Sequence, residues 1–265
     1  MTTVNAYSAN ETGGKLKPFK YELPEFGSEQ VDIKVHYCGL CSSDLSMLYN
    51  DWGMTQYPFV QGHDAVGEVV AVGKEVKSLR TGDLAGVEWN SASCMHCDQC
   101  MGGSHHLCNS LGQTIVGCHG GFSDYVRSRW SWAIPLPHGI DMKKAGLLLC
   151  GGITVFNPTV SGVKPTYQVG AVLEPLSITG SALIAGEKSV AGSPNGSPAL
   201  TCIIPDFCVR HNIYPMVEEF PMPEVNEAFV HLKAGKARNR IVLKVYQSIC
   251  FYTPNYKPDY RFRYN

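Results

Sequence analysis

Short runs of β-branched and other apolar residues recur through the first 157 residues, and glycine-containing turns separate them. The clearest runs are Val31–Val35, Gly67–Val72 and Leu84–Val87, with turn residues at Gly73 and Thr81–Asp83. Short strands at regular spacing, joined by glycine turns, are typical of a β-barrel or a β-sandwich. We therefore predict a barrel or sandwich for this part of the chain.

The pattern changes between residues 162 and 198, where the chain is low in charge and dense in Gly, Ser and Pro. This stretch contains two possible short strands, Gln168–Val172 and Lys188–Ala191. No segment in it has the length and periodicity of a long helix.

Residues 199–245 alternate between helical and strand-like patterns. We predict a helix over Ala199–His211, a strand over Met216–Phe220 and a closing strand over Arg240–Val245. Between the two strands, a helix is expected to begin at Pro223 and to stop at Gly235. Its apolar residues recur at helical spacing (Val225, Ala228, Phe229 and Leu232).

The composition is that of an ordinary globular protein. Hydrophobic residues make up 44% and charged residues 17% of the 265 residues, and the net charge is −1. This balance gives no reason to expect nucleic acid or a membrane as a partner. The polar segment Met1–Gly14 has no signal-peptide core, and no run of 18 apolar residues occurs, so we expect a cytoplasmic protein. Residues 246–265 are aromatic and basic without periodicity and are expected to be an unrelated tail.

Cysteine is the unusual residue, with eleven copies. Four of them form the pattern C-x2-C-x2-C-x7-C (Cys94, Cys97, Cys100 and Cys108). In a reducing compartment clustered cysteines favour a metal over disulfides, and four thiolates can enclose a structural zinc ion tetrahedrally. An iron–sulfur cluster also uses four cysteines, and four unrelated loop cysteines are the remaining alternative.

A second set of metal ligands is spread along the chain. Cys41 lies in Gly39–Asp44, His63 is followed by Asp64, and Cys150 precedes two glycines. Two thiolates and one imidazole would suit a catalytic zinc site, which keeps one position open. Asp44 is a candidate to orient His63 through the second ring nitrogen. Spacing alone does not join these residues into one site.

Several of these motifs, in this order, resemble the medium-chain, zinc-dependent alcohol dehydrogenases. The resemblance includes Gly39–Asp44, Gly62–Gly67, the four-cysteine loop and Leu149–Thr154, and Asn50–Gly53 followed by Tyr57-Pro58 is similar to the cinnamyl-alcohol-dehydrogenase branch. It covers residues 5–160 and resumes at about 168–245. It implies a mixed β and α/β fold, with a GroES-like β-barrel catalytic domain and a Rossmann domain.

The resemblance also implies roles for single residues. Cys41, His63 and Cys150 would bind the catalytic zinc, and Asp64 stands where the family has a Glu that can approach the metal. Ser43 would relay the alcohol proton, and Trp52 would line the substrate pocket. Three residues would lie near the cofactor, NADP in most members of this branch (Thr154, Ser193 and Arg240). Two zinc ions per chain and an alcohol or aldehyde substrate are therefore expected.

Three residues depart from the family pattern. Ser42 replaces the usual His after the first zinc cysteine, and Ser46 stands where a His often completes the proton relay. Asp64 is one methylene shorter than Glu. These changes leave the zinc ligands in place but weaken the expected path for the proton.

Most of the nucleotide-binding domain is missing from the sequence. The family's G-x-G-x-x-G fingerprint is absent, since no two of the 27 glycines are separated by a single residue. We therefore expect four parts: a GroES-like zinc-binding catalytic domain (1–157), a truncated Rossmann remnant (158–205), a return to the catalytic domain (206–245) and the tail (246–265). Residues 160–200 are expected to be poorly packed or re-docked on the barrel, because apolar residues there lose their partners (Val172, Leu173, Ile178, Leu183 and Ile184).

Two functions follow from this division. The first is a zinc-dependent oxidoreductase that interconverts alcohols and aldehydes with NADP and is impaired in this chain. The alternative is a non-catalytic zinc-binding GroES-like fragment or protein-binding pseudoenzyme. Family homodimers pair through the edge of the nucleotide-binding sheet, so the same dimer is in doubt for this chain.

Overall fold

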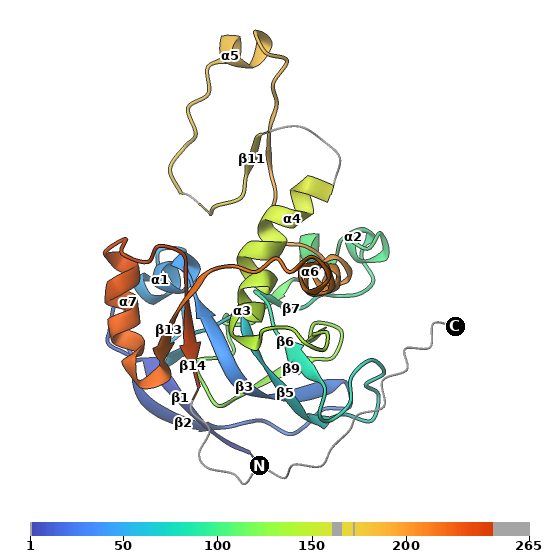
Figure 1. Cartoon of the computed structure of the whole chain (residues 1–265), viewed down its shortest axis with the longest axis vertical. Coiled ribbons are helices and arrows are strands. Elements are labelled where there is room, and N and C mark those ends of the chain that lie inside the picture. Colours follow the sequence, from blue (N-terminus) through green and yellow to red (C-terminus); the bar gives the residue numbers. More distant parts are fainter. Residues whose placement is uncertain (1, 161–165, 172, 246–265) are drawn as a thin grey trace.

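The computed structural model describes residues 2–160, 166–171 and 173–245 (Figure 1). Its body is built on a seven-stranded sheet with the order β10-β6-β5-β3-β14-β13, in which β9 also pairs with β3. The strands of this sheet are β3 (Gln30–Leu40), β5 (Ala65–Val72), β6 (Leu84–Gly86), β9 (Tyr125–Arg129), β10 (Ile134–Pro135), β13 (Val217–Pro221) and β14 (Arg240–Lys244).

Strand β3 is the centre of this sheet, because it pairs with β5, β9 and β14. Its ladder with β5 is irregular after Asp32 and again after Val35. Irregularities of this kind bend a strand and increase its twist, which lets one long strand serve two parts of a curved sheet. A second sheet, β2-β1-β4, lies beside it, and β7 pairs with β8. These strands are β1 (Thr3–Ala9), β2 (Lys17–Glu22), β4 (Phe59–Val60), β7 (Asn90–Ala92) and β8 (Gly112–Gln113).

Helices cover the outside and one end of the sheets (Figure 1). They are α1 (Ser42–Tyr49), α2 (Asp98–Met101), α3 (Met142–Leu147), α4 (Ile153–Val160), α5 (Gly180–Ile184), α6 (Pro198–His211) and α7 (Val225–Lys233). Three tighter or wider turns adjoin them: η1 (His105–Leu107), η2 (Leu148–Gly152) and η3 (Met222–Glu224). Figure 1 shows α7 and α1 side by side, and α4 beside α6, and both pairs are in contact.

The main apolar core joins the two larger sheets and α7. Val31, Ile33 and Val35 point into it from β3, and Ala228 and Phe229 enter it from α7. Each is at most 6% exposed. Burying an aliphatic or aromatic side chain of this size contributes about 1.5–3 kcal/mol. This cluster therefore stabilises the sheets and helices that position the metal ligands.

Most of the predicted elements are present. The predicted runs lie in β3, β5 and β6, and the predicted helix at Ala199–His211 is α6. The closing strands are β13 and β14, and the helix expected from Pro223 starts as η3 and continues as α7. Helices α1, α3 and α4 were not predicted, because each is only six to eight residues long and adjoins a glycine-containing motif.

Residues 166–171 and 173–192, which we call the arm, extend away from the body (Figure 1). The arm contains β11 (Thr166–Gln168) and β12 (Val190–Gly192), which form a two-stranded parallel ladder, with α5 between them. The expected poor packing is confirmed: Leu173 is 70%, Ile178 47% and Ile184 81% exposed, although Leu183 is half-buried.

Parts of two predictions lie outside the described residues, namely Val172 and the tail 246–265. The described strand β11 ends at Gln168, so the strand expected over Gln168–Val172 begins and ends earlier than predicted. Among the described residues, no helix reaches the length and apolar character that crossing a bilayer requires.

Candidate metal centres

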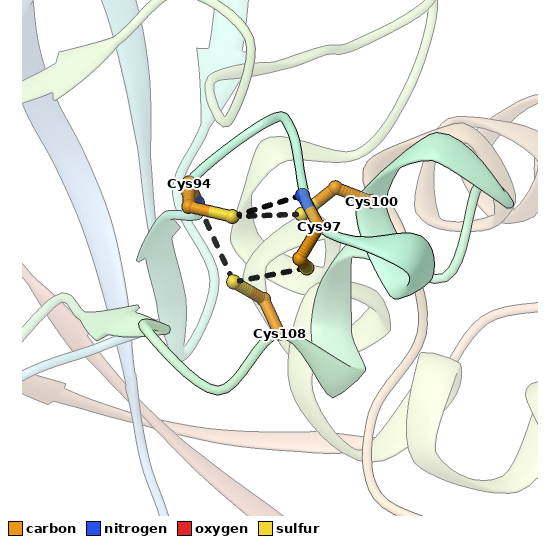
Figure 2. A group of neighbouring side chains, drawn as sticks. All are labelled: Cys94, Cys97, Cys100 and Cys108. Atoms are coloured by element: carbon orange, nitrogen blue, oxygen red, sulfur yellow. Dashed lines mark hydrogen bonds between the residues drawn. The ribbon is translucent and has the colours of Figure 1, made fainter.

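The four clustered cysteines converge in one loop between β7 and β8 (Figure 2). The sulfurs of Cys94, Cys97, Cys100 and Cys108 all lie within 4.8 Å of one another. The Cys94–Cys100 and Cys97–Cys108 sulfur pairs are both 3.9 Å apart. A zinc ion about 2.3 Å from each sulfur would hold tetrahedral thiolates about 3.8 Å apart, so the loop fits a closed structural zinc site.

Backbone N–H groups support the sulfurs from the loop itself. The N–H of Cys97 donates to the Cys94 sulfur at 3.3 Å, and the Cys108 sulfur accepts from Cys94 and Ser110. Hydrogen bonds from the His96 and Cys97 backbone lower the pKa of Cys94 to about 6. Stabilising a thiolate in this way prepares the loop for a cation. Helix α2 and turn η1 give the loop its shape.

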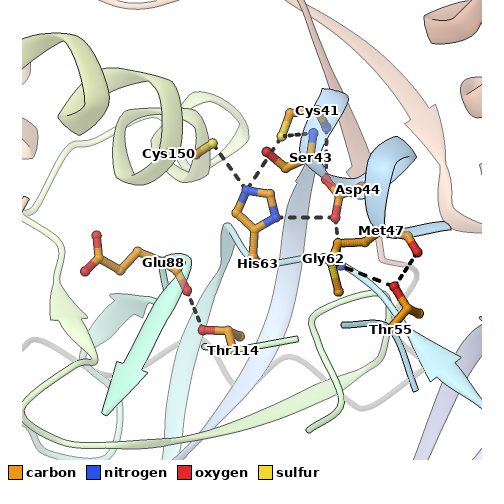
Figure 3. A network of polar contacts seen from close by, with 10 residues as sticks. All are labelled: Cys41, Ser43, Asp44, Met47, Thr55, Gly62, His63, Glu88, Thr114 and Cys150. Carbon is orange, nitrogen blue, oxygen red and sulfur yellow. Dashed lines mark hydrogen bonds and ion pairs between the residues drawn. The ribbon is translucent and has the colours of Figure 1, made fainter. Parts of the chain in front are cut away.

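The second set of ligands meets at one end of the barrel (Figure 3). His63 Nε2 lies 3.2 Å from the Cys150 sulfur and 3.6 Å from the Cys41 sulfur. All three donor atoms fall within 4.8 Å of one another, and Cys41 and His63 are buried. Two soft sulfurs and one imidazole nitrogen at this separation are a donor set that fits zinc with a fourth position left open. The three residues come from separate parts of the chain: the start of α1, the connection between β4 and β5, and turn η2.

Asp44 joins two of these ligands. Its Oδ2 accepts from the Cys41 N–H at 3.0 Å, and its Oδ1 accepts from the Gly62 N–H at 3.2 Å. Oδ1 is also 3.3 Å from His63 Nδ1, although without the geometry of a straight hydrogen bond. Contact with a carboxylate places the proton of the imidazole on Nδ1 and leaves Nε2 free to bind a metal. Asp44 also completes the capping box that starts α1.

Asp64 lies behind the three ligands and outside the group of three. It is fully buried, and neither carboxylate oxygen has a hydrogen-bond partner among the described residues. Desolvation by burial raises its pKa to about 7. The carboxylate fills the space over Gly39, where an added Cβ would lie 2.1 Å from Asp64 Oδ2. Any larger residue at position 39 would therefore displace Asp64.

A cleft of about 880 Å³ opens onto Cys41, His63 and Cys150. Its other lining residues include the serines of α1 and several aromatic or aliphatic side chains (Ser42, Ser43, Ser46, Trp52, Met54 and Trp89). Ser43 and Trp52 therefore line the same cleft as the metal ligands. Ser42 and Ser46, which stand in place of histidines, face the same cleft.

The three residues expected near a cofactor do not share one cavity. Thr154 and Arg240 line the same cleft as the metal ligands, and the Thr154 hydroxyl donates to the Cys150 carbonyl at 2.8 Å. The Arg240 guanidinium packs against Gly151, next to Cys150. Ser193 instead lines a separate cavity of about 470 Å³ beside the zinc loop, where it accepts from Asn157.

Two residues beside the metal ligands were not predicted from the sequence. The Trp89 ring meets the His63 ring edge-on, with centroids 5.2 Å apart, and meets Trp52 at 5.6 Å. Glu88, which precedes it, is fully buried. In the sequence, Glu88 and Trp89 lie between the third apolar run and the four-cysteine loop. This position alone does not predict that Trp89 contacts His63 or that Glu88 contacts α6.

Known proteins are similar to this chain in sequence and in fold. Residues 27–138 match the alcohol dehydrogenase GroES-like domain. Aldehyde reductase AdhA from Synechocystis is 36% identical over 330 positions, which span 91% of this chain and 98% of the relative. Cinnamyl alcohol dehydrogenase 7 from Arabidopsis thaliana is 37% identical over 174 residues, 62% of this chain and 49% of that protein.

Solved structures agree on the fold. A cinnamyl alcohol dehydrogenase from Sorghum bicolor superposes with a TM-score of 0.85 at 24% identity, covering 92% of this chain and 98% of the other. A Helicobacter pylori enzyme, solved with NADP(H), gives 0.82 at 20% identity with the same coverage. The predicted fold class is thereby confirmed.

The comparison also gives the size of the missing part. The alignment with the Synechocystis protein has 330 positions, whereas 91% of 265 residues is about 241, so about 89 positions have no counterpart here. A difference of this size agrees with the missing fingerprint. The chain therefore belongs to the medium-chain, zinc-dependent alcohol dehydrogenase family of oxidoreductases, in the branch similar to cinnamyl alcohol dehydrogenases.

Proposed function

We propose that this chain is a zinc-dependent oxidoreductase that interconverts an alcohol and an aldehyde with NADP, with hydride transfer impaired. The observation that carries the proposal is the convergence of Cys41, His63 and Cys150 at the floor of a cleft of about 880 Å³. The family relationship supports the reaction class, and the lost segment is the reason to expect impairment.

The chain's own residues would prepare the cleft for this reaction. Zinc, when held by Cys41, His63 and Cys150, would polarise the oxygen of the substrate as a Lewis acid. Asp44 keeps the His63 ring in the tautomer and orientation that bind a metal. Ser43 lies beside Cys41 in the cleft and would pass the alcohol proton towards solvent.

The wall of the cleft would favour an apolar substrate tail. Trp52 and Trp89 meet edge-on, and Met54 lies with them along the lining. Aromatic walls exclude water and supply a large apolar contact area. A polar oxygen directed at the metal ligands and an apolar tail against these rings would suit the alcohol or aldehyde class.

We propose two zinc ions per chain. The four-cysteine loop supports one of them, and the three-ligand cluster supports the other. Asp64 is proposed to tune the second site through its charge and not as a ligand. None of the ten described cysteines forms a disulfide, which supports the cytoplasm as the compartment because thiolates stay reduced there.

The chain keeps some of the residues expected near the cofactor but lacks the loop that would bind its pyrophosphate. Thr154 and Arg240 remain in the cleft, and Ser193 is close by in sequence to its lining residues Pro194 and Asn195. The glycine fingerprint that holds the pyrophosphate is absent. We therefore propose the domain division at residues 157, 205 and 245. We do not extend the family homodimer to this chain, since β11 and β12 are the only described strands of the sheet through whose edge the family pairs.

The proposal is tested by zinc content and turnover in matched variants. We expect two zinc ions per chain, and slow aldehyde reduction by NADPH that the substitution Cys150→Ser abolishes together with one zinc. Cys118→Ser is the control, because Cys118 is exposed and belongs to neither metal cluster. Equal turnover in the Cys150→Ser protein would contradict a catalytic role for this cluster.

A further inference from the structure

Glu88 is a buried carboxyl group between the barrel and α6. It lies between β6 and β7, is 0% exposed, and its side chain points away from His63 (Figure 3). Its Oε2 lies 3.3 Å from the hydroxyl oxygen of Thr201 on α6, 113 residues further along the chain. Its Oε1 has no hydrogen-bond partner within the part of the chain that the structure describes.

No cation compensates for a charge at this position. Among the described residues, no Lys, Arg or His forms an ion pair with Glu88. Burying an unpaired carboxylate is so costly that such a group neutralises instead. Desolvation by burial raises the pKa of Glu88 to about 8, and contacts with Thr201 and Asn90 and the field of His63 only partly oppose that rise.

The number of hydrogens that Thr201 can donate also favours a neutral Glu88. A threonine hydroxyl has a single hydrogen to donate. The Thr201 hydroxyl lies 3.0 Å from the Ser197 carbonyl oxygen, which can only accept, and 3.3 Å from Glu88 Oε2. If Thr201 donates to the nearer oxygen, the contact with Glu88 needs a hydrogen from the carboxyl group. A protonated Glu88 supplies it.

The contact connects α6 with the metal centre. Trp89 follows Glu88 directly and packs against the His63 ring. Helix α6 packs against η2, which carries Cys150. Besides His63, Cys202 on α6 is a titratable group near Glu88 among the described residues, and burial followed by the charge of Glu88 raises the pKa of its thiol to about 11. A change at Glu88 therefore acts on both sides of the cleft.

We propose that Glu88 is held as a neutral carboxylic acid that donates a hydrogen bond to Thr201 and thereby fastens α6 to the strand segment carrying Trp89. Glu88 is a positioning residue, and the proton it carries controls how firmly α6 docks. Undocking α6 exposes Glu88, which then ionises at any pH above its ordinary value. Docking is therefore strongest at low pH and weakens as the pH rises to about 8.

The test uses the zinc-loaded full chain and needs no turnover, so it is independent of the proposed function. Burial also raises the pKa of Asp64, to about 7, so the test compares infrared difference spectra at pH 6. The spectrum of the unmodified chain minus that of the Glu88→Gln protein should show the carbonyl stretch of one protonated carboxylic acid, and Thr201→Val should shift that band. Glu75→Gln, at an exposed position, is the control and should give no such difference band. A Glu88→Gln difference spectrum without this band would overturn the proposal.

Amide exchange of α6, corrected for intrinsic rates, provides the second readout. Protection in the unmodified chain should fall about tenfold per pH unit between roughly pH 5 and 8, because one proton is released on undocking. Glu88→Gln, which keeps a donor, should abolish that slope and retain protection, whereas Glu88→Ala should lose protection at every pH. A slope unchanged by Glu88→Gln, or equal protection in the Gln and Ala variants, would overturn the role of the proton.

Discussion

Ile33 and Ile184 are the same kind of side chain in two differently supported regions. Ile33 stands on β3, is fully buried, and contributes to the core of the barrel. Ile184 ends α5 in the arm and is 81% exposed. Both residues lie in sequence that resembles the same family. Ile33 packs against other core residues of the barrel, whereas Ile184 in the arm is exposed. Resemblance preserves local structure, whereas burial depends on neighbours elsewhere in the chain.

The same contrast applies to function. The metal ligands stand on the barrel and on turns packed against it, and both clusters converge within 4.8 Å. The arm provides Val169, Gly170, Ala171 and Leu173 to the cleft, but β11 and β12 pair only with each other. Parallel strands are normally buried on both faces by helices and further strands. The zinc-binding part of the chain, residues 1–157, therefore has its full set of metal ligands, whereas the nucleotide-binding part has only two described strands.

The largest effect is expected from breaking the four-cysteine loop. Cys100→Ser removes one of four thiolates from a site whose metal binding is coupled to folding, and should cost about 5 kcal/mol or more. The protein should lose one zinc ion and melt at a lower temperature by calorimetry. Cys118→Ser is the matched control and should do neither. An unchanged zinc content in the Cys100→Ser protein would contradict the structural site.

The next effect tests the comparison of the two isoleucines directly. Ile33→Ala should destabilise the chain by about 2–5 kcal/mol, because it leaves a cavity in a packed core. Ile184→Ala should change the free energy of unfolding by less than about 0.5 kcal/mol, as exposed substitutions do. Urea denaturation of both variants measures the difference. Similar losses for the two would show that the arm is packed in solution.

A smaller effect follows from the pH dependence of Glu88. Its pKa is raised to about 8 in the folded chain, so its contribution to stability is complete at low pH and is lost between its ordinary value and about 8. Glu88→Gln should therefore raise the free energy of unfolding at pH 7.5 by roughly 2–4 kcal/mol, since each pH unit above the ordinary pKa costs the carboxyl group up to about 1.4 kcal/mol. Comparing the two proteins at pH 5, where the gain should nearly vanish, separates this effect from a general gain in packing.

The smallest effect concerns the residue that orients His63. Asp44→Asn should weaken zinc binding at the three-ligand cluster about 10- to 100-fold, because the amide orients the imidazole less well. Competition with a chelator measures this affinity, and the four-cysteine site in the same protein is the internal control. Equal weakening at both sites would mean that Asp44 acts through folding and not through His63.

The sequence predicted most of what depends on local pattern or motif. The cysteine spacing indicated the closed site, and strands β3, β5 and β6 followed from their apolar runs. The convergence of Cys41, His63 and Cys150 required the resemblance, because 87 residues separate His63 from Cys150. Two features could not be predicted in this way. Ser193 lies in a separate cavity, and Glu88 meets Thr201 only because α6 folds back onto the barrel.

The difference between a complete zinc half and an incomplete nucleotide half is tested most directly by a cofactor titration. NADPH is added to protein that carries two zinc ions per chain, and the nicotinamide fluorescence is followed. We predict only weak binding that does not saturate, in keeping with the slow turnover proposed above, because the glycine loop that holds the pyrophosphate is missing. Saturable binding of one NADPH per chain would contradict this conclusion and would show that Thr154, Arg240 and the arm suffice to hold the cofactor.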